Sequence, residues 1–163
     1  MSKMKKDELY DAIRQEWSNM HHNASISGSF PELQNDYESK LFWDVLGDEV
    51  SFWIQDLKEL VKEKFGYDWD YYSYGRMGAT IAPDDIKAAS AGNSFAAIRS
   101  EAIPDDYNEM YELYNALKFI NEYWKNTAEN IPEWWKEVKE ANEYQSDIDE
   151  HEGKKEIQCT KWV

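Results

Sequence analysis

The apolar residues between positions 37 and 65 recur at steps of three and four, and this pattern restricts the fold more than any other feature of the sequence. Such spacing places them on one face of an α-helix. Gly66 fits a left-handed C-terminal cap, because glycine adopts that backbone conformation without steric strain. Gly47 interrupts the segment and leaves open whether it forms one helix or two. The apolar face consists of Leu41, Phe42, Val45, Leu46, Val50, Trp53, Ile54, Leu57, Leu60 and Val61.

Further helices are predicted from the same periodicity. Leu9, Ile13 and Trp17 indicate a first helix over about residues 4–21. Residues 105–128 and 132–145 each carry a similar stripe, and we expect these two segments to pack as a helical hairpin. The polar run SDIDEHEGKK that follows is expected to be a solvent-exposed loop.

A short sheet is predicted from a different pattern. Tyr67, Trp69 and Tyr71 alternate with other residues, which is typical of a strand. The glycines that follow and the apolar run at 80–82 indicate an antiparallel hairpin over about 67–82, with a turn near 75–78. A last strand over about 156–162 is expected to pair with it. The sequence thus predicts a single globular domain over 1–163, of the α+β class and mainly helical, with a small antiparallel sheet.

The charge of the chain limits which partners it can have. The sequence holds 33 acidic and 18 basic residues, a formal net charge of −15. Residues 105–153 alone hold 14 acidic and 4 basic residues, a net charge of −10. Carboxylates at this density repel nucleic acids and anionic lipids. We therefore expect a basic protein as the partner, with no direct binding of nucleic acid or membrane.

Metal and cofactor sites have little support in the sequence. Cys159 is the only cysteine, so neither an internal disulfide nor a multi-cysteine zinc site is expected. Asp147, Asp149 and the residues after them resemble the start of a calcium-binding loop. The sixth and twelfth positions of that loop are Glu152 and Gln158 in place of the required glycine and glutamate. We expect no metal or cofactor, and a cytoplasmic location, because the N-terminus lacks the apolar run of a signal peptide.

Enzymatic signatures are also missing from the sequence. His21 and His22 are adjacent and point about 100° apart on a helix, so they do not form a chelating pair. They are expected to end the first helix, where a histidine interacts well with the helix dipole. The sequence contains no G-x-S-x-G motif. These observations favour a binding role over catalysis.

The glycine-flanked arginine of the stretch YSYGRMGAT has two interpretations. In the first, Arg76 neutralises a nearby carboxylate from Asp68, Asp70 or Asp84. In the second, its guanidinium captures an anion, as part of a small-molecule or nucleotide site. The candidate ligand residues for that site are Tyr72, Tyr74, Arg76 and Thr80.

The acidic helices near the C-terminus provide the main functional hypothesis. In size, acidity and aromatic content the chain resembles the small decoy proteins that bacteriophages use against host defence systems. That likeness implies an inhibitor that presents a surface like nucleic acid to a nucleic-acid-handling protein. A structural subunit of an assembly stays open as a third interpretation. The candidate partner-binding residues are Glu133, Trp134, Trp135, Glu137, Glu140, Glu143, Asp147 and Asp149.

Overall fold

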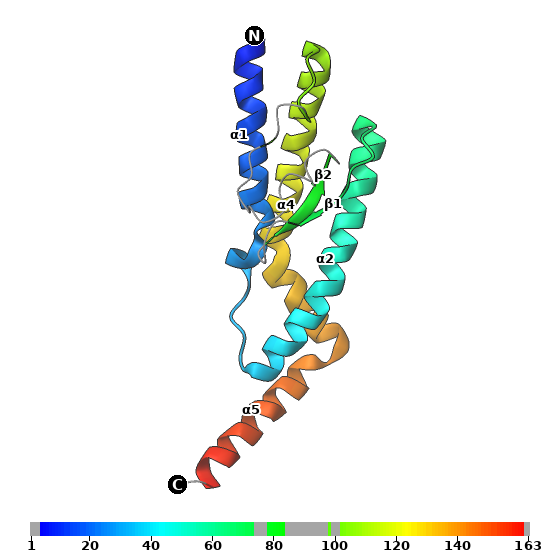
Figure 1. The fold of residues 1–163 in the computed structure, drawn as a ribbon. Coiled ribbons are helices and arrows are strands. Elements are labelled where there is room, and N and C mark those ends of the chain that lie inside the picture. The colour runs from blue at the N-terminus through cyan, green and yellow to red at the C-terminus, as the bar shows by residue number, and fades with distance from the viewer. Residues whose placement is uncertain (1–3, 74–77, 84–97, 99–101, 162–163) are drawn as a thin grey trace. The chain divides into compact units, whose positions relative to one another are not determined.

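The computed structural model describes residues 4–73, 78–83, 98 and 102–161, with side chains up to residue 153. It belongs to the α+β class and is mainly helical, as predicted (Figure 1). The elements in chain order are α1 (Lys6–Ala24), the 3-10 helix η1 (Ile26–Ser29), α2 (Asp36–Phe65), β1 (Asp70–Ser73), β2 (Ala79–Ala82), α4 (Tyr107–Asn142) and α5 (Tyr144–Lys161).

The chain divides into two compact units. Unit 1 comprises Met1–Gly28 and Trp53–Ala128, and unit 2 comprises Ser29–Phe52 and Glu129–Val163. The three boundaries fall inside η1, α2 and α4, so the long helices α2 and α4 each contribute residues to both units. The prediction of a single domain stays a prediction at this point.

The core of unit 1 forms around α1, which matches the first predicted helix. Its apolar stripe is buried, together with residues from α2, β2 and α4. α1 and the first part of α4 run side by side in the same direction (Figure 1), and the Tyr107 hydroxyl donates to the backbone oxygen of Met4 at 2.6 Å. The largest fully buried side chains of unit 1 are Leu9, Ile13, Trp17, Met20, Leu57, Ile81, Met110, Leu117 and Trp124.

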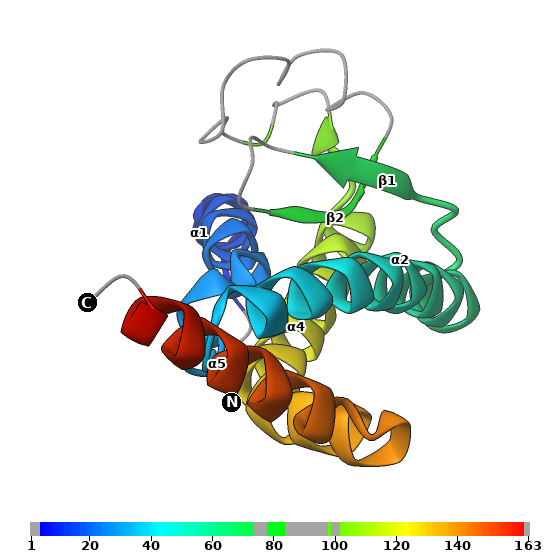
Figure 2. The same ribbon diagram turned by 90° about the horizontal axis from the view of Figure 1, so that it is seen from below.

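The predicted antiparallel hairpin is confirmed, but its first strand begins later than predicted. β1 pairs with β2 in antiparallel register, with Tyr72 opposite Thr80. β2 lies next to α1 and α4 and β1 lies outside it (Figure 2). Tyr72 is buried, whereas Tyr71 is 51% exposed. The alternation that we read from Tyr67 onward fails because the strand begins only at Asp70.

Several sequence predictions lie outside the described residues. They are the turn near 75–78, apart from residue 78, and the candidate ligand residues Tyr74 and Arg76. The interpretation in which Arg76 neutralises a nearby carboxylate therefore stays a prediction.

The predicted helical hairpin over 105–128 and 132–145 is wrong. α4 is one helix of 36 residues that continues through Pro132. Ala128, Ile131 and Trp135 are buried on its core side around this position. The packing of that face outweighs the loss of one backbone hydrogen bond at the proline. In the same way α2 is continuous through Gly47, which decides between the two possibilities left open above.

The chain leaves the direction of α4 at Glu143, whose φ is 58°. From Tyr144 to Lys161 it forms α5, so both the predicted loop at 146–155 and the predicted strand at 156–162 are wrong. Ile148 is fully buried in unit 2 and anchors α5 there. The alternation of apolar residues at its end was too short to distinguish a strand from a helix.

Candidate functional site

Four glutamates on the second part of α4 share one face of the helix. Glu129, Glu133, Glu137 and Glu140 are all exposed, and we call them the carboxylate stripe. At 3.6 residues per turn they fall within a sector of about 80°, over a length of about 17 Å. None of their side chains forms an ion pair or hydrogen bond with any residue that the structure describes. Their charges are therefore available to an external partner.

The orientation of the stripe is set by a buried contact on the opposite side of α4. Trp135 is 1% exposed, and its indole Nε1 donates to Oε2 of Glu38 at 2.7 Å. Lys139, one turn further along α4, brings its Nζ to 3.1 Å from the same oxygen. Because Trp135 and Lys139 face Glu38 of α2, the glutamates on the other side of α4 face solvent.

The Glu38 carboxylate is buried but remains ionised at neutral pH. Burial raises its pKa, yet hydrogen bonds from the backbone N–H of Gln34, from Trp135 and from Lys139 together bring the pKa below the ordinary value. The Gln34 N–H lies 2.6 Å from Oε1, so both carboxylate oxygens have donors. A buried charge with this many partners is stable only in one arrangement of its neighbours.

The start of α2 explains how Glu38 comes to lie there. Asn35 caps the helix by accepting a hydrogen bond from the Glu38 backbone N–H at 2.9 Å. A capping residue followed three positions later by glutamate is a signature of a helix N-terminus. That pattern is visible in the sequence as N-D-Y-E, and the sequence analysis missed it. It was the signal that could have identified Glu38.

An aromatic patch borders this region of unit 2. Trp43 is 57% exposed, and its ring centroid lies 5.3 Å from that of Phe30 and 6.2 Å from that of Phe42. Phe42 also contacts Trp134, at 6.3 Å between centroids. Trp134 is half-buried on α4, between the carboxylate stripe and the core. We define the aromatic patch as Phe30, Trp43 and Trp134.

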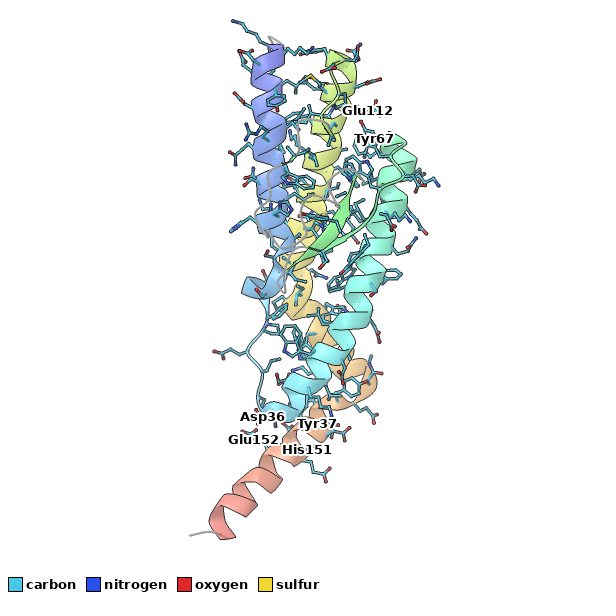
Figure 3. The ribbon with its side chains drawn as sticks, in the orientation of Figure 1. Asp36, Tyr37, Tyr67, Glu112, His151 and Glu152 are labelled. Carbon is cyan, nitrogen blue, oxygen red and sulfur yellow. The ribbon has the colours of Figure 1, made fainter. Side chains whose placement is uncertain are left out.

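α5 is held against the segment before α2 by polar contacts. Asp149 accepts hydrogen bonds from the side chains of Gln34 and Gln145, each at 2.9 Å. These bonds lower the pKa of Asp149. The rings of Tyr37 and His151 stack with centroids 3.8 Å apart (Figure 3). Asp149 thus has a structural partner within the protein, which the stripe glutamates lack.

The predicted partner-binding residues separate into different environments. Glu143 and Asp147 are exposed, at the turn before α5 and in its first turn. Trp135 corrects the expectation of an exposed ring, because it lies in the core of unit 2 with its N–H bound to Glu38. Trp43 is the exposed tryptophan of this unit among the described residues, and sequence analysis did not single it out.

The candidate ligand residues of the hairpin are described only in part. Tyr74 and Arg76 lie outside the described residues. Tyr72 is buried and its ring contacts Trp17 and His21. Thr80 is also buried, and its hydroxyl accepts from Nε1 of Trp124 at 3.0 Å. The ligand role of this group stays a prediction.

Neither the described side chains nor comparisons with known proteins identify a further site. Among the described residues, no group of three or more His, Cys, Asp or Glu side chains is arranged to hold a metal ion. None of the described helices combines the length and apolar content needed to cross a bilayer. No protein-family model, curated protein or solved structure matches the chain.

Proposed function

We propose that the protein is an inhibitor that binds a basic, nucleic-acid-handling protein through the carboxylate stripe. In this proposal it is a decoy of the kind that bacteriophages direct against host defence. The single observation that carries the proposal is the stripe itself, four exposed glutamates on one helical face with no partner among the described residues.

The charge density of the stripe supports this choice of partner. Four charges over about 17 Å correspond to one per roughly 5.5 Å of helix axis. One strand of duplex DNA carries a charge every 3.4 Å or so, which makes the stripe a little over half as dense. Unit 2 as a whole holds 16 acidic and 6 basic residues, a net charge of −10. A groove built for phosphates would be attracted to such a surface.

The aromatic patch supplies the apolar contacts that would provide most of the affinity. Exposed ion pairs contribute little affinity each, typically less than about 1 kcal/mol. Tight interfaces depend on a few buried anchors, among which tryptophan is over-represented. Trp43 offers such a ring, because more than half of its surface is exposed. We expect the stripe to steer association and Trp43 to slow dissociation.

The experiment begins with capture of proteins from a bacterial lysate on the immobilised protein, at low and at high salt. The captured protein is then purified, and its complex with a labelled DNA duplex or RNA is followed by fluorescence polarisation. Addition of the inhibitor should displace the nucleic acid. The competition should weaken steeply as salt is raised, because the contacts are electrostatic.

Matched charge variants make this test specific. The stripe variant carries Glu129→Gln, Glu133→Gln, Glu137→Gln and Glu140→Gln. We expect its affinity to fall about 30-fold or more, taking roughly 0.5 kcal/mol for each lost pair. The control changes the same number of exposed carboxylates in unit 1, at Glu8, Asp11, Glu59 and Glu63. If both variants bind equally well, the stripe is not the binding surface.

A further inference from the structure

A polar pocket of about 330 Å³ lies between α1 and α4 in unit 1. Its volume is at the lower end of the range of ligand sites and corresponds to about 11 water molecules in the liquid. Every residue of the lining is polar or charged. They are Glu16, Asn19, His22, Asn23, Lys118, Asn121, Glu122 and Lys125.

Asn121 fixes the position of one carboxylate in this pocket. Its side chain is buried, and its Nδ2 donates to Oε2 of Glu16 at 2.9 Å and to the Glu16 backbone oxygen at 3.3 Å. The amide of Asn23 donates in turn to Oδ1 of Asn121. One oxygen of Glu16 is therefore held by the protein, while Oε1 forms no hydrogen bond with any described residue.

The opposite charge is supplied by α4. Lys125 takes part in no ion pair with the residues that the structure describes. The ammonium of Lys118 lies over the ring of Tyr114, 5.3 Å from its centroid. Two lysines and two glutamates leave the lining with balanced charge, in a chain whose net charge is −15. The pocket thus offers both a carboxylate and an ammonium group.

This lining disfavours most classes of ligand. An apolar molecule would find no apolar residue in the lining, and the exposed imidazole of His22 is the one ring in the lining on which a nucleobase could stack. A phosphate group would be repelled by Glu16 and Glu122, and a simple cation by Lys118 and Lys125. A small molecule that carries both charges satisfies both kinds of group.

We propose that the α1–α4 pocket binds a small zwitterion of the amino-acid class. The ligand's ammonium group donates to Oε1 of Glu16, and its carboxylate pairs with Lys125. Asn19 and Asn23 line the same pocket and supply neutral amide groups for the rest of the ligand. This site is in unit 1 and is independent of the inhibitor function proposed for unit 2.

The first test is a thermal melt of the full chain with each of the common L-amino acids. At a concentration about ten times the dissociation constant, the binding amino acid should raise Tm by about 4 °C. Its methyl ester, which lacks the carboxylate charge, and its N-acetyl form, which lacks the ammonium, should each lose most of that shift. The proposal is overturned if no amino acid raises Tm, or if both derivatives act as well as the parent.

Two variants then locate the site. Glu16→Gln retains an oxygen that accepts from Asn121 but removes the charge, and we expect it to weaken binding about tenfold or more in calorimetric titration. Lys125→Gln should do the same through the ligand carboxylate. Glu8→Gln, two turns earlier on α1, should bind as the wild type does. Unchanged affinity in both pocket variants, with folding shown by circular dichroism, would place the ligand elsewhere and overturn the assignment.

Discussion

Glu38 and His21 are both buried and titratable, but at neutral pH Glu38 is charged and His21 is neutral. Glu38 is ionised, and three donors from Gln34, Trp135 and Lys139 compensate for its burial. His21 is surrounded by rings, with its centroid 4.7 Å from that of Trp17 and 5.7 Å from that of Tyr72. Burial lowers the pKa of His21 to about 4, although a hydrogen bond with the Trp17 backbone opposes the change.

Acid should therefore destabilise the fold through His21. Between pH 6.5 and 4 the unfolded chain takes up a proton that the folded chain does not, so the free energy of unfolding decreases over this range. We expect His21 to contribute a loss of about 2 kcal/mol, after allowance for solvent screening. His21→Phe should lose less stability than the wild type between pH 7 and 4.5 in urea unfolding.

The neighbouring histidine is the control for this measurement. His22 is exposed, in contrast to His21. His22→Gln should keep the acid response of the wild type. An equal response in the His21 and His22 variants would show that carboxylates dominate the acid sensitivity and that His21 does not contribute.

At the level of elements, α4 is a continuous helix with a proline, Pro132, in its interior. Pro132 has no N–H to donate to the carbonyl of Ala128, and its ring crowds that carbonyl. The helix nevertheless continues, because Ile131 and Trp135 on either side of the proline are buried. The proline itself is exposed, so it contributes no core packing of its own.

Replacement of this proline should stabilise the protein. Pro132→Ala restores the missing backbone hydrogen bond and favours the helix, and we expect the free energy of unfolding to rise by about 1–3 kcal/mol. Guanidinium unfolding followed by circular dichroism measures the change. Asn130→Ala, at a nearby exposed position, should produce a smaller increase. A decrease in stability on Pro132→Ala would mean that the proline supports a required local geometry.

Sequence patterns predicted the long helices α1 and α2. They failed where contacts with residues distant in the sequence determine the local structure. α1 and α2 have stripes that only a helix can bury on one side, so periodicity was sufficient. The failure at Pro132 arose because a local helix breaker was weighed without the packing around it. The failure at α5 arose because Ile148 is its one described residue that is buried. Three of the four stripe glutamates, Glu133, Glu137 and Glu140, were among the predicted partner-binding residues because the C-terminal helices are so acidic. Glu38 needed its distant partners to be recognised as buried.

At the level of the whole molecule, two long α-helices contribute residues to both units. α2 and α4 each cross a boundary between units without interruption. Unfolding one unit alone would end both helices in their interior and expose unpaired backbone groups there. Shared helices of this kind favour cooperative unfolding, as the sequence-based prediction of a single domain implies.

We accordingly expect one thermal transition, with calorimetric and van't Hoff enthalpies that agree. Phe42→Ala removes a fully buried ring from unit 2 and should lower stability by about 3–5 kcal/mol. The variant should shift the whole transition to lower temperature without splitting it. Two resolved transitions, in the wild type or in the variant, would show that the units unfold independently.

The contact of Glu38 with Trp135 and Lys139 also bears on how distant homologues of this protein could be recognised. The Trp135 N–H and the Lys139 ammonium are separated by one helical turn and share one carboxylate oxygen. Loss of either donor alone would weaken the support of that charge, so the three positions are expected to change together over evolutionary time. The spaced patterns N-x-x-E and W-x-x-x-K therefore provide a fingerprint for distant homologues whose overall similarity has been lost.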